Sequence, residues 1–172
     1  AGFVWQGVFN FYELYMLDKG LAPNVARNAL TVVFGAGVPA FLISGRLADR
    51  FPHVPYLLSV LAAFVVCLFA LVSVSGLVPL LVVSAVIGYV IHSLFPAMDT
   101  YLLDTLPDAT RGSAYAVYSA SMMIVQATGS SVVGSLRGAG VAYDAVFGAA
   151  AVGLVVLLVG LVVAQRASWL PE

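Results

Sequence analysis

The chain of 172 residues is 62% apolar and only 9% charged, with a formal net charge of −1. A soluble domain is about a quarter charged, and a disordered chain combines low hydrophobicity with high net charge, so both classes are excluded. Because no basic run is present, nucleic acid is excluded as a partner too, and what remains is an integral membrane protein.

Six apolar stretches are long enough to form membrane helices, which need about 20 mostly apolar residues each. They cover residues 1–17, 29–44, 56–74, 77–99, 112–136 and 145–164. These stretches are too long, and alternate too little, for the strands of a transmembrane barrel. The sequence therefore predicts an all-α, polytopic membrane protein, with residues 1–172 forming one bundle of six transmembrane helices.

The first stretch lacks the basic region and the small-residue cleavage site of a signal peptide, and Ala1 already lies within an apolar run. We therefore expect that residue 1 is not the native start and that the first span has lost part of its beginning. The polar tail after residue 164 is typical of a natural C-terminus. Positive charges favour a cytoplasmic C-terminus in the cell (inner or plasma) membrane, by four basic residues to three.

Polarity is distributed unevenly over the six predicted spans. The stretches 56–74 and 145–164 contain no charged residue and little polarity, which is typical of lipid-facing or peripheral helices. Polar residues concentrate in the first, fourth and fifth spans, so that a similar order of three spans occurs twice. Repeats of three spans with inverted topology are a known transporter architecture. The sequence therefore predicts two inverted three-helix repeats.

The polar residues of these spans recur at helical spacing, so that they share one face of each helix. Polar residues inside a span usually face the bundle interior or a water-filled cavity. The resulting candidates for a substrate or ion pathway are Asn10 and Glu13 in the first span, His92 in the fourth and Gln126 in the fifth.

Each candidate also has a purely structural interpretation. Glu13 lies near the outer end of its span, from where it can reach water, and amide side chains can simply bond between helices. His92 can act in proton coupling, because imidazole titrates near physiological pH, or it can be a packing histidine whose polar atoms are satisfied. The sequence leaves both interpretations open at each position.

A motif with a sharper meaning lies between the second and third spans, where residues 45–53 read GRLADRFPH. It resembles the major facilitator superfamily signature G-x-L-[AS]-D-[RK]-x-G-[RK]-[RK]. The matching positions are Gly45, Leu47, Ala48, Asp49 and Arg50. Pro52 stands where the family has a glycine, and family members usually carry the more degraded copy of the motif in their second half. The resemblance therefore implies the C-terminal half of a twelve-helix transporter whose N-terminal six-helix half is missing here.

The resemblance also implies a mechanism, that of a secondary active transporter that moves a small solute or a drug-like compound by alternating access. Proton coupling through Glu13 or His92 is one option, and both efflux and uptake by a permease stay open. Asp49 is expected to brace the cytoplasmic gate with the help of Arg50. Because the main partner of a second-half motif comes from the first half, we expect Asp49 to lack a strong partner outside its own loop. The expected partners are the substrate, protons, the lipid bilayer and the missing half.

Enzyme chemistry finds no support in the residues. The single cysteine, Cys67, excludes an internal disulfide and a CxxC pair, and the two histidines lie far apart in the chain, so no metal site and no cofactor are predicted. Phosphate-binding glycine loops are absent as well. The alternative from a different class is a self-contained six-span membrane protein that acts as a homodimeric channel or scaffold.

Overall fold

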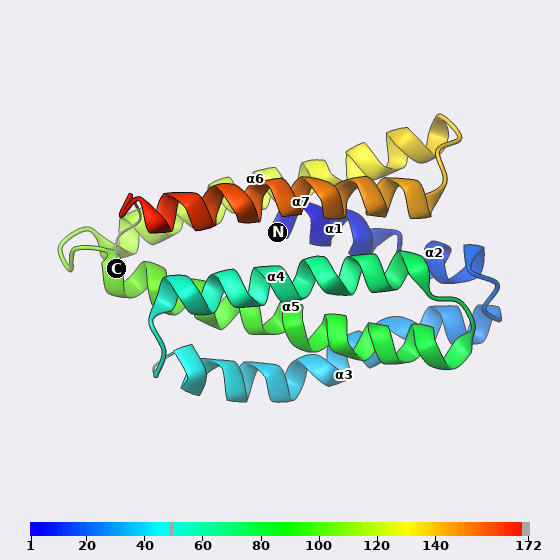
Figure 1. Ribbon diagram of the computed structural model, residues 1–172, viewed down its shortest axis with the longest axis horizontal. Helices are drawn as coiled ribbons and strands as arrows, with labels where there is room; N and C mark the ends of the chain where they lie inside the picture. Colours follow the sequence, from blue (N-terminus) through cyan, green and yellow to red (C-terminus); the bar gives the residue numbers. More distant parts are fainter. Residues whose placement is uncertain (49, 170–172) are drawn as a thin grey trace.

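The structure is a computed structural model that describes residues 1–48 and 50–169. Within these residues the chain folds into seven α-helices and no strand, and the longer helices run roughly along the long axis of the molecule (Figure 1). The helices are α1 (Gly2–Asn10), α2 (Tyr12–Asp18), α3 (Pro23–Ala48), α4 (His53–Ser73), α5 (Leu77–Thr105), α6 (Arg111–Gly138) and α7 (Tyr143–Arg166).

Four of these helices, namely α3, α4, α5 and α7, are long and apolar enough to cross a membrane. The prediction of an all-α membrane protein is thereby confirmed. The first predicted span is divided into two short helices, because the backbone leaves the helical conformation at Phe11. Helix α6 has 28 residues, and its many serine and glycine residues make it less apolar than the other long helices.

The structure corrects the predicted start of the second span. Helix α3 begins at Pro23 rather than at residue 29, so the second part of the predicted polar loop is helical. Proline suits the first turn of a helix, where its missing N–H leaves no bond unmade. Ala26 and Ala29 are fully buried, so packing favours the helix in a stretch whose Asn and Arg residues indicated a loop.

Two helix pairs form the closest packing in the bundle, since α3 packs along α5 and α1 packs along α6. Helix α4 contacts both α5 and α7, and α2 contacts α3. Helices α5 and α6, although consecutive in the chain, make few contacts with each other. A groove lies at this loosely packed boundary between α5 and α6.

Glycine makes both close crossings feasible. A Cβ atom on Gly88 of α5 would lie 2.1 Å from the carbonyl oxygen of Val33 in α3. A Cβ atom on Gly129 of α6 would likewise lie 2.1 Å from the carbonyl oxygen of Phe3 in α1. Small residues allow helix backbones to approach closely where lipid supplies no hydrophobic driving force. Each crossing therefore depends on a position without a side chain.

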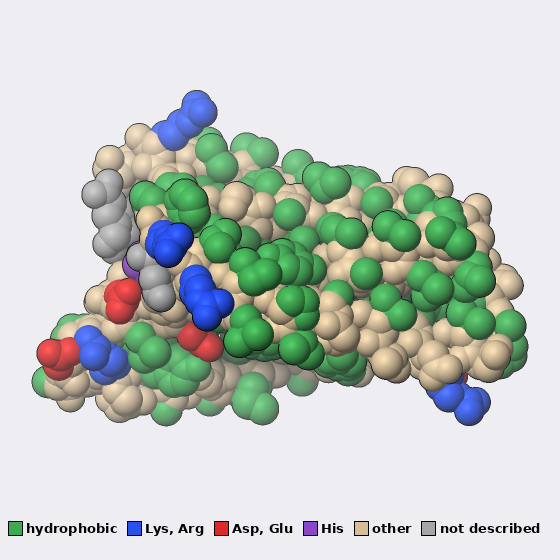
Figure 2. All heavy atoms as spheres, turned by 90° about the horizontal axis from the view of Figure 1, so that it is seen from below, with side chains coloured by type: hydrophobic (Ala, Val, Ile, Leu, Met, Phe, Trp, Pro, Cys, Tyr) green, Lys and Arg blue, Asp and Glu red, His purple; other side chains and the backbone are tan. Residues whose placement is uncertain are grey.

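The surface is apolar over much of its area. On the face shown in Figure 2, charged side chains gather mainly toward one end of the molecule, and hydrophobic side chains cover most of the rest. Val66, Ile124 and Val156, on three different helices, are each exposed by about two thirds. Exposed apolar area of this extent marks a surface that lipid or another protein covers.

Candidate functional site

Two of the predicted pathway residues lie where α1 meets α6. Asn10 Nδ2 donates a hydrogen bond to Ser130 Oγ, and Ser130 Oγ lies 3.3 Å from the backbone oxygen of Gln6. Gln126 lies one helical turn before Ser130 on α6, beside Gly2, where an added Cβ would come within 2.9 Å of Gln126 Nε2. The structure therefore gathers Asn10 and Gln126 along one interface.

Gln126 also borders a groove of about 190 Å³ between α5 and α6. The other lining residues are Ala1, Gly2, Ile91, Leu94, Phe95, Met98, Asp99, Tyr118 and Met122. The Tyr115 hydroxyl donates a hydrogen bond to Asp99 Oδ1 over 3.1 Å. The groove thus has apolar and aromatic walls, and its polar side-chain groups are an amide, a carboxylate and the Tyr118 hydroxyl.

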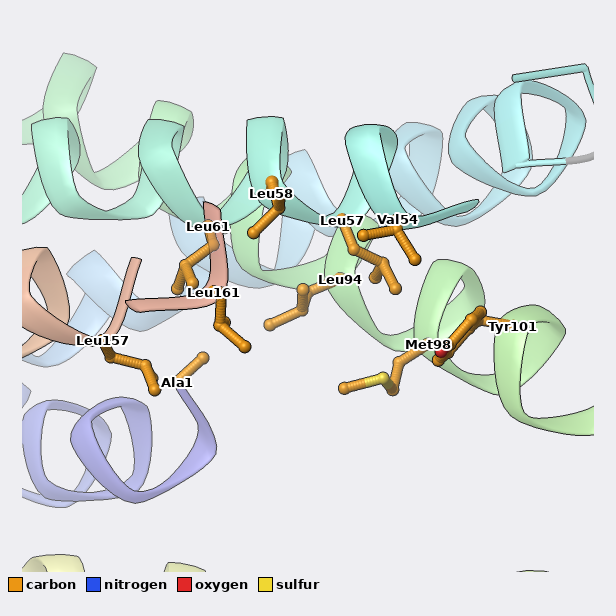
Figure 3. Close-up of a pocket in the computed structure, with 10 residues that line it drawn as sticks. All are labelled: Ala1, Val54, Leu57, Leu58, Leu61, Leu94, Met98, Tyr101, Leu157 and Leu161. Carbon is orange, nitrogen blue, oxygen red and sulfur yellow. The ribbon is translucent and has the colours of Figure 1, made fainter. Parts of the chain in front are cut away.

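A second cavity, of about 220 Å³, lies between α4, α5 and α7 (Figure 3). Its lining consists of Ala1, Val54, Leu57, Leu58, Leu61, Leu94, Met98, Tyr101, Leu157 and Leu161. The two cavities share Ala1, Leu94 and Met98 in their linings, so they are neighbours. Almost all of the lining of the second cavity is aliphatic.

His92 lies apart from the α1–α6 interface, in an enclosure between α3 and α5. The residue is 8% exposed, and its Nδ1 lies 2.7 Å from the carbonyl oxygen of Gly88. The rings of Phe34 and Phe41 approach it edge-on, with centroids 5.5 and 5.6 Å away. An added Cβ on Gly37 would lie 2.6 Å from the His92 ring, so glycine makes room for the imidazole. These surroundings are those expected of a packing histidine.

Glu13 does not join Asn10. The helix is interrupted at Phe11 between the two residues, and Glu13 Oε1 lies 3.8 Å from Arg27 Nε on α3. Both side chains of this ion pair are well exposed to solvent. An exposed pair of this kind contributes about 0 to 1 kcal/mol to stability. Asn10 instead bonds to α6, so the structure separates two residues that the helical period placed on one face.

The family motif lies at the end of α3. Gly45 and Leu47 are half-buried in its last turns, whereas Arg50 is exposed in the turn that follows. The backbone N–H groups of Arg50 and Phe51 both lie 3.0 Å from the carbonyl oxygen of Leu47, which ends the helix. Asp49 lies outside the described residues, so the expectation about its partners stays a prediction.

Sequence reasoning did not find a polar network at the opposite end of the bundle. Lys19 Nζ lies 3.0 Å from both Asp144 Oδ2 and the carbonyl oxygen of Val72. The buried Tyr15 hydroxyl donates to Asp144 Oδ1 over 2.7 Å and lies 3.0 Å from the carbonyl oxygen of Leu71. The network joins α2, the end of α4 and the start of α7. No local pattern pairs these residues, because they come from distant parts of the chain.

Long apolar helices, an apolar surface and polar groups held between helices define a polytopic helical membrane protein. The family profile of the Major Facilitator Superfamily matches residues 1–171. The chain belongs to this superfamily, and the family predicted from the motif after the second span is confirmed.

A curated relative is named "Uncharacterized MFS-type transporter YwfA" and comes from Bacillus subtilis (strain 168). It is 28% identical over 151 residues, which are 88% of this chain and 35% of the relative. The chain therefore spans about a third of the length of this relative. No solved structure matches the chain.

Proposed function

We propose that the chain is the C-terminal six-helix bundle of a secondary active transporter. The complete protein would move a small solute or a drug-like compound across the cell membrane by alternating access, in which two bundles rock about a central site. The observation that carries this proposal is the family match over residues 1–171. The same match favours transport over an enzymatic role.

The helix contacts support the two inverted three-helix repeats. With α1 and α2 counted as one span, the repeats are α1 to α4 and α5 to α7. In this count α3 and α5 are the second and fourth spans, and α6 and α1 are the fifth and first. Exchanging the two repeats converts a contact between the second and fourth spans into a contact between the fifth and first spans. Both are close crossings that require glycine, at Gly88 in the first case and at Gly129 in the second. A pair of related crossings between the two repeats is what inverted repeats produce.

The pathway in this proposal runs along α1, α5 and α6, with Asn10 and Gln126 among its lining residues. Helices α4 and α7, which pack on each other and are strongly apolar, then face lipid. The C-terminus lies in the cytoplasm, and Gly45, Leu47, Asp49 and Arg50 belong to the cytoplasmic gate, as the family resemblance implies.

Proton coupling belongs to the proposal as an option with a direct test. Glu13 has the solvent access that a coupling carboxylate needs, whereas His92 is enclosed by phenylalanine rings. Transport by the Glu13→Gln variant should lose its pH dependence if Glu13 is the coupling group. An unchanged rate and pH profile would remove Glu13 from this role.

The alternative of a self-contained six-span homodimer is not favoured. The curated relative extends well beyond the region matched by this chain, which supports a larger protein with a second bundle. Apolar side chains are exposed both on helices that would face lipid and on helices that would face a second bundle, which is consistent with such a partner.

The proposal is tested by cysteine accessibility in the full-length protein, with the buried Cys67 replaced by alanine. A cysteine at Gln126 is treated with a membrane-impermeant maleimide applied from either side of the membrane. Alternating access predicts labelling from both sides, because the groove opens to each in turn. The matched control is Val156→Cys on the exposed apolar face of α7, which should be labelled from neither side. Labelling of the Gln126 cysteine from one side only would contradict alternating access.

A further inference from the structure

We propose that the groove between α5 and α6 selects organic cations with an apolar body, and that Asp99 binds the positive charge. This inference rests on the proposed transport function and names the class of substrate. It concerns an amphipathic monocation such as an aryl-alkyl ammonium compound.

The position of Asp99 is the first argument. Helix α5 continues to Thr105, so Asp99 lies more than a full turn inside the helix, about 9 Å from its end at about 1.5 Å per residue. Its side chain borders the groove and is only partly exposed. Leu77 and Asp99 are about 33 Å apart along α5, which is close to the thickness of the hydrocarbon region, so Asp99 lies at the edge of the membrane, where water can bring a charged solute to the groove.

The charge balance of the groove is the second argument. Asp99 is the one charged side chain among the described residues that line it, and no lysine or arginine within residues 1–48 and 50–169 forms an ion pair with Asp99. The Tyr115 hydroxyl donates to Oδ1, while Oδ2 accepts no hydrogen bond from any described side chain. The carboxylate is thus oriented by Tyr115 through one oxygen, and its charge favours a cation over an anion.

The walls of the groove are the third argument. The groove that Asp99 borders is also lined by Phe95, Met98, Tyr118 and Met122. Aromatic faces attract ammonium groups, and thioethers adapt to apolar groups of different shapes. A sugar or another polyhydroxylated solute would leave its hydroxyl groups without partners on such walls. The lining therefore favours an apolar body attached to the charge.

The extent of the groove is the fourth argument. Tyr118 and Gln126 lie two turns apart on α6, about 12 Å along the helix. The aliphatic cavity of Figure 3 shares Leu94 and Met98 with the groove, so apolar surface continues beyond the groove. Ala1 borders both cavities, and any residues that precede it in a longer chain would shape their common wall. A cation at Asp99 can then place its apolar body toward Leu94.

The test measures equilibrium binding to the purified full-length protein with two radiolabelled probes. One probe is 3-phenylpropyl-trimethylammonium, and the other is its neutral isostere with a tert-butyl group in place of the ammonium. The two probes have the same shape and differ in charge. We expect the Asp99→Asn variant to bind the cation about tenfold more weakly, or about 1.4 kcal/mol, and to bind the neutral probe as the wild type does.

Two further variants make the test specific. Asp99→Glu keeps the charge and should keep the preference for the cation, which separates the role of the carboxylate from that of the fold. Asp104→Asn removes an exposed carboxylate farther along the same helix, beside His53 and outside the groove, and should leave both affinities unchanged. Equal losses in Asp99→Asn and Asp104→Asn would overturn the proposal.

Failure of this inference is distinguishable from failure of the proposed function. If neither probe binds, or if both bind equally well to the wild type, the cation preference is wrong. Two-sided labelling of the Gln126 cysteine does not depend on any substrate, so alternating access would still stand in that case. One-sided labelling together with tight cation binding would instead support a cation site in a protein that does not alternate.

Discussion

Replacing Gly88 with alanine tests whether the crossing of α3 and α5 depends on a missing side chain. The added Cβ would lie 2.1 Å from the carbonyl oxygen of Val33 and 2.8 Å from its carbonyl carbon and Cα. All three atoms belong to the backbone, so no side-chain rotation can relieve the overlap. The two helices themselves must move apart.

The size of the effect follows from this overlap. Ordinary contacts of a Cβ atom begin near 3.4 Å, so the crossing must open by about 1.3 Å. Overpacking of a well-packed core costs about 1–3 kcal/mol, and contact with backbone on a rigid helix favours the upper end. Alanine regains about 1 kcal/mol through its higher helix propensity. We therefore expect a net loss of about 2 kcal/mol, which lowers the melting temperature of the longer full-length protein by about 2–4 °C, because the shift per kcal/mol falls as the chain grows.

The assay is thermal unfolding of the purified full-length protein in detergent, followed by circular dichroism. The matched control is Gly148→Ala in α7, where an added Cβ meets no atom within 4 Å. This control gains the same helix propensity without the overlap and should melt at or above the wild-type temperature. If Gly88→Ala melts no lower than Gly148→Ala, the steric reasoning fails and the crossing is more adaptable than its geometry indicates.

The remaining predictions concern polar contacts between helices. Tyr15→Phe removes the hydrogen bond to Asp144 and the contact with the carbonyl oxygen of Leu71. We expect this variant to lose about 1–2 kcal/mol of stability in the same unfolding assay. An unchanged melting temperature would show that water replaces both partners. For Asn10 and Ser130, alanine variants made singly and together should give a coupling energy of about 0.6 kcal/mol between α1 and α6. A coupling of zero would mean that the bond does not stabilise the interface.

The helices could largely be predicted from the sequence, because the bilayer sets their length and hydropathy is a local property. The predicted ends of the third, fourth, fifth and sixth spans agree with α4 to α7 to within a few residues, apart from the longer C-terminal end of α5. The interruption at Phe11 was not predicted, since neither proline nor glycine marks it. The start of α3 at Pro23 depends on the burial of Ala26 and Ala29, which composition does not reveal.

The candidate site was less predictable, because its contacts form between distant segments. Helical period identified Asn10 and Gln126 as residues of one surface, but not that Ser130 bonds Asn10. The aromatic enclosure of His92 needs Phe34 and Phe41 from another helix. The family, by contrast, could be predicted from a few residues after the second span, because a gate motif occupies consecutive positions of the chain.

The position of the groove follows from where the helices can and cannot approach. Glycine closes the α3–α5 crossing at Gly88 and the α1–α6 crossing at Gly129. Between α5 and α6, large side chains such as Phe95 and Tyr118 stand instead, and the two helices make few contacts. A bundle built this way has two tight pairs and an open boundary between α5 and α6. The α3–α5 and α1–α6 pairs supply the close helix packing of the bundle. The residues at the α5–α6 boundary are therefore not required for that packing and can serve binding instead.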